Sequence, residues 1–278
     1  MVQWRGRRGS SNVIDIRGNK GKAALGCGPI LIVILGLIFG VDLTQIAALL
    51  GGGQTAQVEQ APGAGVQDEA GEFVSVILAD LETTWGTLFA ERGERYPEPE
   101  LVLFTDRVQS ACGIAGAAVG PFYCPSDQRV YLDLSFFRQL QQLGATGDFA
   151  VAYVIAHEVG HHVQNVTGVL GAVRQQQRRL DQASANALSV RTELQADCYA
   201  GIWAHYAETE RDLLEAGDIQ EGIDAAAAVG DDYLQRRSGG AAVPESFTHG
   251  TSAQRAEAFQ TGLRSGDLAA CDTFADLR

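Results

Sequence analysis

The longest apolar stretch of this chain lies near its start, at residues 23–41, where 19 successive positions carry no charged side chain. At about 1.5 Å per residue, a helix of that length crosses a hydrocarbon core about 30 Å thick. Arginine and lysine residues precede the stretch, and Asp42 follows it. By the positive-inside rule, this pattern predicts one transmembrane helix of the cytoplasmic membrane, with residues 1–22 in the cytoplasm and the rest of the chain on the periplasmic or extracellular side.

Two other interpretations of this stretch are open. A cleaved signal peptide has a shorter apolar region followed by a small-residue cleavage site, whereas residues 40–43 form a poor cleavage site. A lipid-modified cysteine follows its apolar segment, whereas Cys27 lies near the start of this one. The pattern therefore favours an uncleaved anchor that contains Cys27 as a small apolar residue.

The chain after this anchor divides into a linker and a body. Residues 51–70 are rich in glycine, alanine and glutamine and hold no large apolar side chain except valine. Such a segment cannot build a core, so residues 42–70 are predicted to form a flexible linker. The body, residues 71–278, is long enough to bury a hydrophobic core of its own.

Within the body, apolar residues recur mainly at the three-to-four-residue spacing of amphipathic helices, as in residues 71–91. Short β-prone runs at residues 101–104 and 130–134 predict strands, and the Gly- and Ala-rich residues 113–121 predict a loop. Further helices are predicted over residues 136–143, 149–166, 172–188, 192–211, 219–236 and 252–265. The body is therefore expected to be an α+β domain, mainly helical with a small β-sheet.

Charge is unevenly distributed along the chain. The chain has 21 basic and 34 acidic residues, a formal net charge of −13. Residues 1–22 hold six basic residues and one acidic residue, so the remainder carries a net charge of −18. An acidic body repels phosphate backbones, which argues against nucleic acid as its partner.

The cysteines are consistent with export of the body. Besides Cys27, the chain contains Cys112, Cys124, Cys198 and Cys271. An even number of cysteines in an oxidising compartment favours two disulfides, and three pairings are possible. We predict the local pairing, Cys112 with Cys124 and Cys198 with Cys271, because the first two bracket a glycine-rich loop. Four free buried thiols are the alternative.

The strongest chemical signal is His157-Glu158-Val159-Gly160-His161, in the helix predicted to begin after an Asp148 N-cap. Residues i and i+4 share one helix face, so the two imidazoles can hold a single zinc ion. Glu158 lies roughly 100° further around the helix, where it can take a proton from a zinc-bound water. This pattern is typical of zinc metallopeptidases.

A catalytic zinc site also needs a third protein ligand. The metzincin extension is absent, because Gln164 and Thr167 stand where that class has its glycine and third histidine. Instead, Glu193 and Asp197 follow 32 and 36 residues after His161, again spaced i and i+4. Glu193 can be the third ligand, and Asp197 can accept a hydrogen bond from the outer nitrogen of a ligand imidazole. The alternative for this pair is a solvated acidic helix face.

Two further features can serve such a site. His249 lies in a loop of small polar residues, where it can donate a hydrogen bond to a developing oxyanion, or else have a simple loop or capping role. The strand at residues 130–134 can pair with an extended substrate.

Six stretches of the sequence are longer than the short motifs that arise by chance. They are residues 5–13, 120–125, 130–137, 156–164, 193–201 and 246–252. Together with the single anchor, they resemble the bacterial putative neutral zinc metallopeptidase family over almost the whole chain. The resemblance implies a zincin-like fold, one zinc ion per chain and a membrane-tethered peptidase, with His157, His161 and Glu193 as ligands and Glu158 as the base. The Glu-x-x-Ala-Asp pattern beginning at Glu193 also resembles the ligand helix of integral-membrane CaaX-prenyl and heat-shock zinc peptidases, which implies Glu193 rather than Asp197 as the ligand.

The sequence therefore predicts a membrane-anchored zinc metallopeptidase that cleaves a peptide or protein substrate. One alternative is a catalytically silent module that contains zinc and binds peptides, in which a fourth protein ligand would close the site. Another is a zinc hydrolase of a non-peptide bond such as a cell-wall amide.

Overall fold

The computed structural model describes residues 1–17, 66, 68–116 and 119–275. These residues belong to one compact unit. The predicted anchor at residues 23–41 and most of the predicted linker lie outside the described residues. In the described ranges, only helix α3 (Glu69–Ala90) has the length and hydropathy to cross a membrane, and most of it is buried inside the unit.

The unit contains a four-stranded sheet with the order β1–β2–β6–β5 and a separate hairpin of β3 and β4. Strands β1, β2 and β6 are parallel, and β5 is antiparallel to β6. The strands are β1 (Val13–Asp15), β2 (Glu100–Phe104), β3 (Arg107–Ser110), β4 (Gly113–Gly116), β5 (Phe122–Cys124) and β6 (Arg129–Asp133). Both predicted strands are confirmed, as β2 and β6, but β4 occupies part of the predicted loop over residues 113–121.

Helices make up most of the unit, as the apolar periodicity predicts. They are α3, α4 (Phe136–Gln142), α5 (Asp148–Val166), α6 (Val169–Gln177), α7 (Gln182–Thr209), α8 (Asp218–Ala228), α9 (Asp231–Arg237) and α10 (Ser252–Ser265), with short 3-10 turns η2 (Pro244–Ser246) and η3 (Leu268–Cys271). The α+β class is confirmed.

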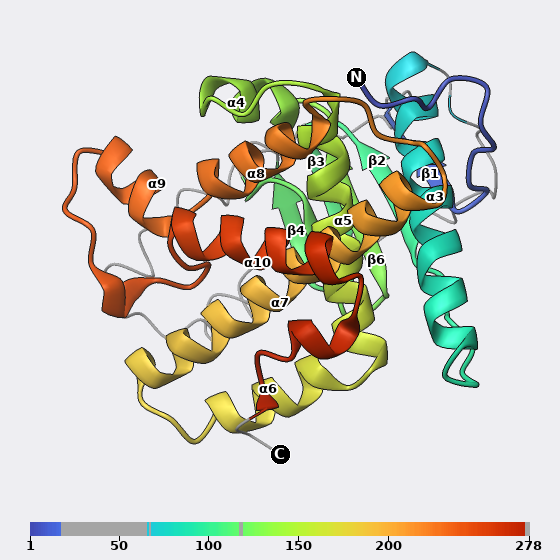
Figure 1. Ribbon diagram of the computed structural model, residues 1–278. Coiled ribbons are helices and arrows are strands. Elements are labelled where there is room, and N and C mark those ends of the chain that lie inside the picture. The colour runs from blue at the N-terminus through green and yellow to red at the C-terminus, as the bar shows by residue number, and fades with distance from the viewer. Residues whose placement is uncertain (18–65, 67, 117–118, 276–278) are drawn as a thin grey trace, which may run out of the picture. The chain divides into compact units, whose positions relative to one another are not determined.

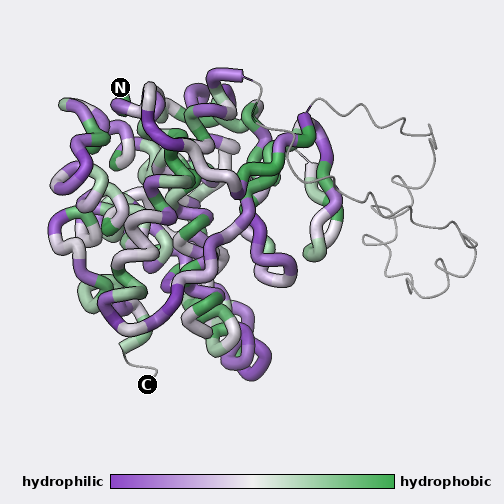
Figure 2. The backbone as a smooth tube through the Cα atoms, turned by 90° about the vertical axis from the view of Figure 1, so that its right-hand side faces the viewer, coloured by the Kyte–Doolittle hydropathy of each residue, from purple (hydrophilic) through white to green (hydrophobic). Residues whose placement is uncertain are grey.

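Helix α5 lies at the centre of the unit (Figure 1). It contacts strands β5 and β6 as well as helices α3, α7 and α8. Its contact with α7 depends on Gly160, because a Cβ at that position would lie only 3.0 Å from the carbonyl oxygen of Ala196. Hydrophobic stretches run mainly through the interior of the domain, and hydrophilic ones lie mainly at its periphery (Figure 2). Helix α5, which carries His157 and His161, thus lies in the core and packs closely against α7.

Four helix boundaries differ from the prediction. The helix predicted over residues 172–188 is divided, because α6 ends at Gln177 and the Asp181 side chain caps the start of α7 by accepting from the Ser184 N–H. Helix α7 continues from Gln182 to Thr209 without a break near residue 190, because residues 182–200 contain no glycine or proline. The helix predicted over residues 219–236 is divided into α8 and α9 at Gly230, where the backbone of Ser252 leaves no room for a Cβ. Helix α5 is capped by Gly147, not Asp148.

Both predicted disulfides are confirmed. Cys112 is bonded to Cys124, and Cys198 is bonded to Cys271. The first bond ties the β3–β4 hairpin to β5, and the second ties α7 to η3. Each bond constrains the unfolded chain more than the folded one and so stabilises the fold.

The first 17 residues, which we call the N-terminal segment, lie in the same compact unit as the body. Strand β1 pairs with β2 through Val13 and Leu101, Ile14 and Val102, and Asp15 and Leu103. This differs from the predicted separate cytoplasmic head. Residues 13–15 are too short a run for their sequence pattern to reveal a strand, and a partner about 90 residues away completes it.

Candidate active site

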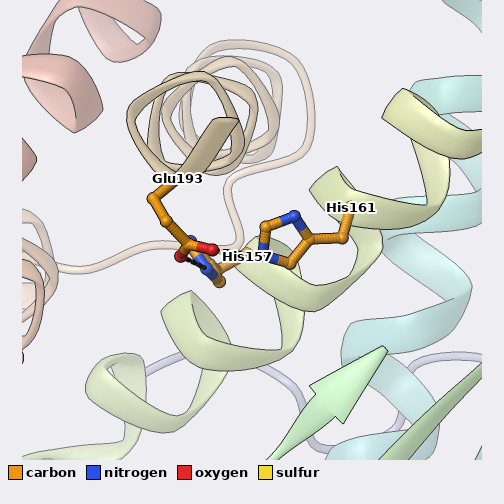
Figure 3. Close-up of side chains that lie close together, drawn as sticks. All are labelled: His157, His161 and Glu193. Atoms are coloured by element: carbon orange, nitrogen blue, oxygen red, sulfur yellow. Dashed lines mark hydrogen bonds and ion pairs between the residues drawn. The ribbon is translucent and has the colours of Figure 1, made fainter. Parts of the chain in front are cut away.

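Three side chains converge between α5 and α7 (Figure 3). His157 and His161 extend from α5, and Glu193 extends from α7. The Glu193 carboxylate oxygens lie 3.2 Å from His157 Nε2 and 3.5 Å from His161 Nε2. One ligand atom from each residue lies within 4.8 Å of the other two. The structure therefore brings together the three ligands expected from the sequence.

A buried carboxylate orients the first imidazole. Asp197 Oδ1 lies 2.8 Å from His157 Nδ1, so the nitrogen that faces away from the three-residue cluster donates to it. Arg255 holds Asp197 in turn, with Nε 2.8 Å from Oδ2 and Nη2 2.9 Å from Oδ1. The Tyr153 hydroxyl also donates to Asp197 Oδ1, at 2.5 Å. This network leaves His157 Nε2 with its lone pair available for a metal ion.

The second imidazole is oriented by an amide. His161 Nδ1 donates to Gln164 Oε1 at 2.8 Å. The Gln164 amide nitrogen donates to the Thr192 carbonyl oxygen at 2.7 Å and to Gln195 Oε1 at 3.1 Å. Gln164 is fully buried, so these bonds are shielded from water. Gln164 therefore couples the orientation of His161 to the position of α7.

The electrostatics of the cluster favour a positive charge within it. Burial disfavours the charged form of His157, but Asp197 and Glu193 outweigh this effect and raise its pKa to about 10. Burial likewise opposes the charge on His161, and the Glu193 carboxylate raises its pKa above the usual value. The pKa of Glu193 is held well below its usual value, against the effect of burial, by the two imidazoles. A divalent cation would meet the same electrostatic demand while the imidazoles stay neutral.

The donor set fits zinc. Two imidazole nitrogens and one carboxylate oxygen are the ligands of many catalytic zinc sites, and such sites keep a fourth position open. Each imidazole has an outer hydrogen-bond partner, as metal-binding histidines almost always do. In the described ranges, no fourth His, Cys, Asp or Glu joins this group.

The cluster opens into a cavity of about 450 Å³. Glu158 lines this cavity beside His157 and His161, as expected for a residue one position further along the helix. Strand β5 contributes Phe122 and Tyr123. Further apolar lining comes from Phe136, Val154, Val229 and Leu234. The cavity thus combines the polar cluster with a largely apolar wall, which suits a binding site for an organic substrate.

Comparison with known proteins agrees with this geometry. Residues 2–274 match the family described as "putative neutral zinc metallopeptidase". The chain belongs to this family. Its relatives include the "Uncharacterized protein YpfJ" of Escherichia coli K12, which is 46% identical over 289 aligned positions that cover 98% of this chain and 99% of the relative. The "Uncharacterized protein Rv2575" of Mycobacterium tuberculosis H37Rv is 47% identical over 191 positions, covering 65% and 64%. No solved structure shows significant similarity to this chain.

In this zinc metallopeptidase family member, His249 also lines the cavity. The loop around it wraps the Asp231 carboxylate, which accepts the backbone N–H groups of Thr248, His249 and Gly250 at 2.6–3.0 Å. His249 Nδ1 lies 3.2 Å from the same carboxylate, and about half of the His249 side chain is exposed. The loop therefore holds His249 at the cavity by backbone capping, and its oxyanion role stays a prediction.

The predicted substrate-pairing strand needs a correction. The strand at residues 130–134 is β6, which lies inside the sheet between β2 and β5. Among the described strands, β5 is the outermost on that side and is also the one that lines the cavity. His162 holds β5 to α5, since its Nδ1 accepts from the Tyr123 hydroxyl at 3.0 Å while its Nε2 donates to the Pro97 carbonyl oxygen. Burial lowers the pKa of His162, which favours this neutral form.

Sequence reasoning missed three residues that support the ligands. Tyr153 is one helical turn before His157, and Gln164 is three residues after His161, so helical spacing alone could have found both. Arg255 lies on α10, 58 residues from Asp197, and no local pattern links the two.

Proposed function

We propose that this protein is a zinc-dependent metallopeptidase that hydrolyses peptide bonds. The observation that carries the proposal is the convergence of His157, His161 and Glu193 beside Glu158 at the wall of an open cavity. A purely structural zinc site has no need of a carboxylate that lines the cavity next to the ligands without joining them. The arrangement also supports a zincin-like fold, in which a buried helix carries the motif close to the edge of a sheet.

The chemistry of the proposal rests on two elements. A zinc ion held by the three ligands would lower the pKa of a water molecule and polarise the scissile carbonyl. Glu158 would accept the proton of the attacking water and then deliver it to the nitrogen of the leaving amine. His249, at the cavity wall, would donate a hydrogen bond to the carbonyl oxygen as negative charge develops there.

Strand β5 supports an extended peptide as the substrate. Its position at the outer side of the sheet lets a substrate strand add to it by main-chain hydrogen bonds. Phe122 and Tyr123 line the cavity from this strand, and Phe136 lines it from α4. Apolar side chains of the substrate would bury their surface against these residues.

A closed, silent zinc site has less support. Asp197 contacts His157 on the side away from the cluster, and Arg255, Tyr153 and His157 Nδ1 already occupy its oxygens. His249 is paired with Asp231. Neither residue is free to close the site without breaking these contacts. Attachment to the membrane through residues 23–41 remains a sequence prediction.

The test compares the full-length chain with its Glu158→Gln variant, both purified in detergent and loaded with zinc. An unfolded protein serves as substrate, and fragments are read by mass spectrometry. The parent should cleave, and Glu158→Gln should keep about one zinc per chain while losing at least 100-fold in rate. A Glu257→Gln variant, changed at an exposed residue of α10, is the control and should cleave normally. Equal cleavage by Glu158→Gln would refute the role of Glu158, and zinc binding without cleavage by the parent would favour the silent module.

A further inference from the structure

The arginine- and glycine-rich motif at residues 5–13 has no place in the proposed chemistry, yet its residues are held at many points of the body. The first of these points is a group of carboxylates that contacts residues 1 and 2. The Met1 nitrogen lies 3.0 Å from Asp218 Oδ1 and 3.3 Å from Glu215 Oε2. The next backbone nitrogen, of Val2, donates to both oxygens of Asp148, at 3.1 and 3.0 Å. Asp148 is therefore occupied by the N-terminus instead of capping α5.

Apolar side chains reinforce this attachment. Val2 and Trp4 are buried, and the Trp4 ring packs edge-on against Phe73 of α3, with centroids 5.8 Å apart. Between them, the Gln3 backbone nitrogen donates to the Leu213 carbonyl oxygen. Burial of one tryptophan and one valine contributes hydrophobic transfer free energy that offsets part of the cost of ordering the segment. The segment is thus bound by hydrophobic contact as well as by charge.

Several basic and small residues of the motif have partners in the body. Arg7 donates to the carbonyl oxygens of Arg211 and Asp212, which follow the end of α7. A Cβ on Gly9 would collide with the Ser75 side chain, so only glycine allows this approach. Ser10 exchanges hydrogen bonds with Ser75, because its N–H donates to the Ser75 carbonyl oxygen and its carbonyl oxygen accepts from Ser75 Oγ.

The contacts continue into the sheet. Ser10 Oγ and Asn12 Nδ2 both donate to Glu82 Oε1 on α3, at 2.6 and 2.8 Å. Strand β1 then adds to β2, with Val13 in the main hydrophobic core. Arg17 ends the segment by pairing with Asp15 and with Asp68, the N-cap of α3. The motif is therefore a folding motif, and each of its polar contacts is made to the same compact unit.

We propose that residues 1–17 dock onto the body as an integral part of its fold, and that they therefore lie on the same side of the membrane as the body. A single crossing at residues 23–41 would separate β1 from β2 and leave the β2 edge and the Asp148 and Asp218 carboxylates without these partners. The two disulfides of the body place that shared side in an oxidising compartment.

The test locates both parts of the full-length chain in intact cells. Single reporter cysteines are introduced by Ser11→Cys in the N-terminal segment and Ser238→Cys in the body, both at exposed positions, in a Cys27→Ser background. A membrane-impermeant maleimide is applied before and after the membrane is disrupted. We expect the ratio of labelling before disruption to labelling after disruption to agree between the two reporters within about twofold. Labelling of one reporter in intact cells and of the other only after disruption would overturn it.

Limited trypsin digestion of the purified full-length protein tests the docking of the N-terminal segment itself. In the docked state, cleavage at Arg7 and Arg17 should be slow, because both side chains are engaged. Asp218→Asn should speed cleavage there at least fivefold, whereas Asp224→Asn, at an exposed position of the same helix, should not. If trypsin cleaved the N-terminal segment of the parent as fast as that of Asp218→Asn, the contacts with Asp218 would not hold the segment on the body.

Discussion

The contact between Arg255 and Asp197 makes a quantitative prediction about the support of the zinc ligands. Both side chains are buried, Arg255 at 3% and Asp197 at 0% exposure, and two hydrogen bonds of 2.8 and 2.9 Å join them. Replacing Arg255 by methionine keeps much of the packing volume but removes the guanidinium that pairs with the buried Asp197 carboxylate, which then keeps only the His157 imidazole as a cationic partner. Breaking such a pair from one side costs about 3–5 kcal/mol. In a domain of this size, that loss corresponds to a fall of about 6–20 °C in Tm.

The assay is thermal and denaturant unfolding of chelator-treated protein, so that bound metal does not contribute to stability. Arg264→Met is the matched control, because Arg264 lies on the same helix but forms an exposed pair with Glu257. The Arg264→Met variant should lose about 1 kcal/mol or less of unfolding free energy. Asp197→Asn alone should also be destabilising, because it leaves the buried guanidinium without its counter-charge.

The decisive comparison is the double variant. If Arg255 and Asp197 stabilise the fold as a pair, Arg255→Met with Asp197→Asn should be more stable than the sum of the two single losses predicts, by about 2 kcal/mol. Additive losses to within about 0.5 kcal/mol would refute a direct coupling. So would an Arg255→Met variant as stable as Arg264→Met.

Three further predictions follow from other contacts. Gln164→Leu removes the acceptor for His161 Nδ1–H and should weaken zinc binding about 10–100-fold in a competition with a chromogenic chelator; unchanged affinity would exclude an orienting role. Hydrogen bonding to Asp218 raises the pKa of the Met1 ammonium from 8.0 to about 10, so the folded state holds this proton more tightly than the unfolded chain. Its stabilising contribution is complete below about pH 8 and is lost as pH rises to about 10, and denaturant unfolding should show a decrease there that an N-acetylated chain lacks. Removing the disulfide between Cys198 and Cys271, which are 73 residues apart, by double alanine substitution should cost about 4 kcal/mol of unfolding free energy, and a loss below about 1 kcal/mol would contradict the chain-entropy account.

Features encoded at short range could be predicted before the fold was known. The spacing of His157 and His161 places both imidazoles on one face of any helix, and the same holds for Glu193 and Asp197. Apolar periodicity predicted most helices, and β-branched and aromatic runs predicted β2 and β6. The disulfide pairing was also predicted, from the compartment and the loop between Cys112 and Cys124.

Features that depend on partners far apart in the chain could not be predicted from the sequence. Arg255 meets Asp197 only because glycines on α7 and α10 let those helices pack closely: Gly201 faces the Phe259 backbone, and Gly262 faces the Cys198 backbone. The outer position of β5 follows from the order of the strands and not from its own residues. A three-residue strand such as β1 has almost no periodicity of its own, and the basic residues around it suggested a membrane flank. Periodicity and motif spacing report which residues share a face, whereas the contacts that each face makes arise from burial and pairing between segments far apart in the chain. The chemistry of the zinc ligands could therefore be seen in the sequence, while the network that holds them and the docking of the N-terminus emerged only in the folded chain.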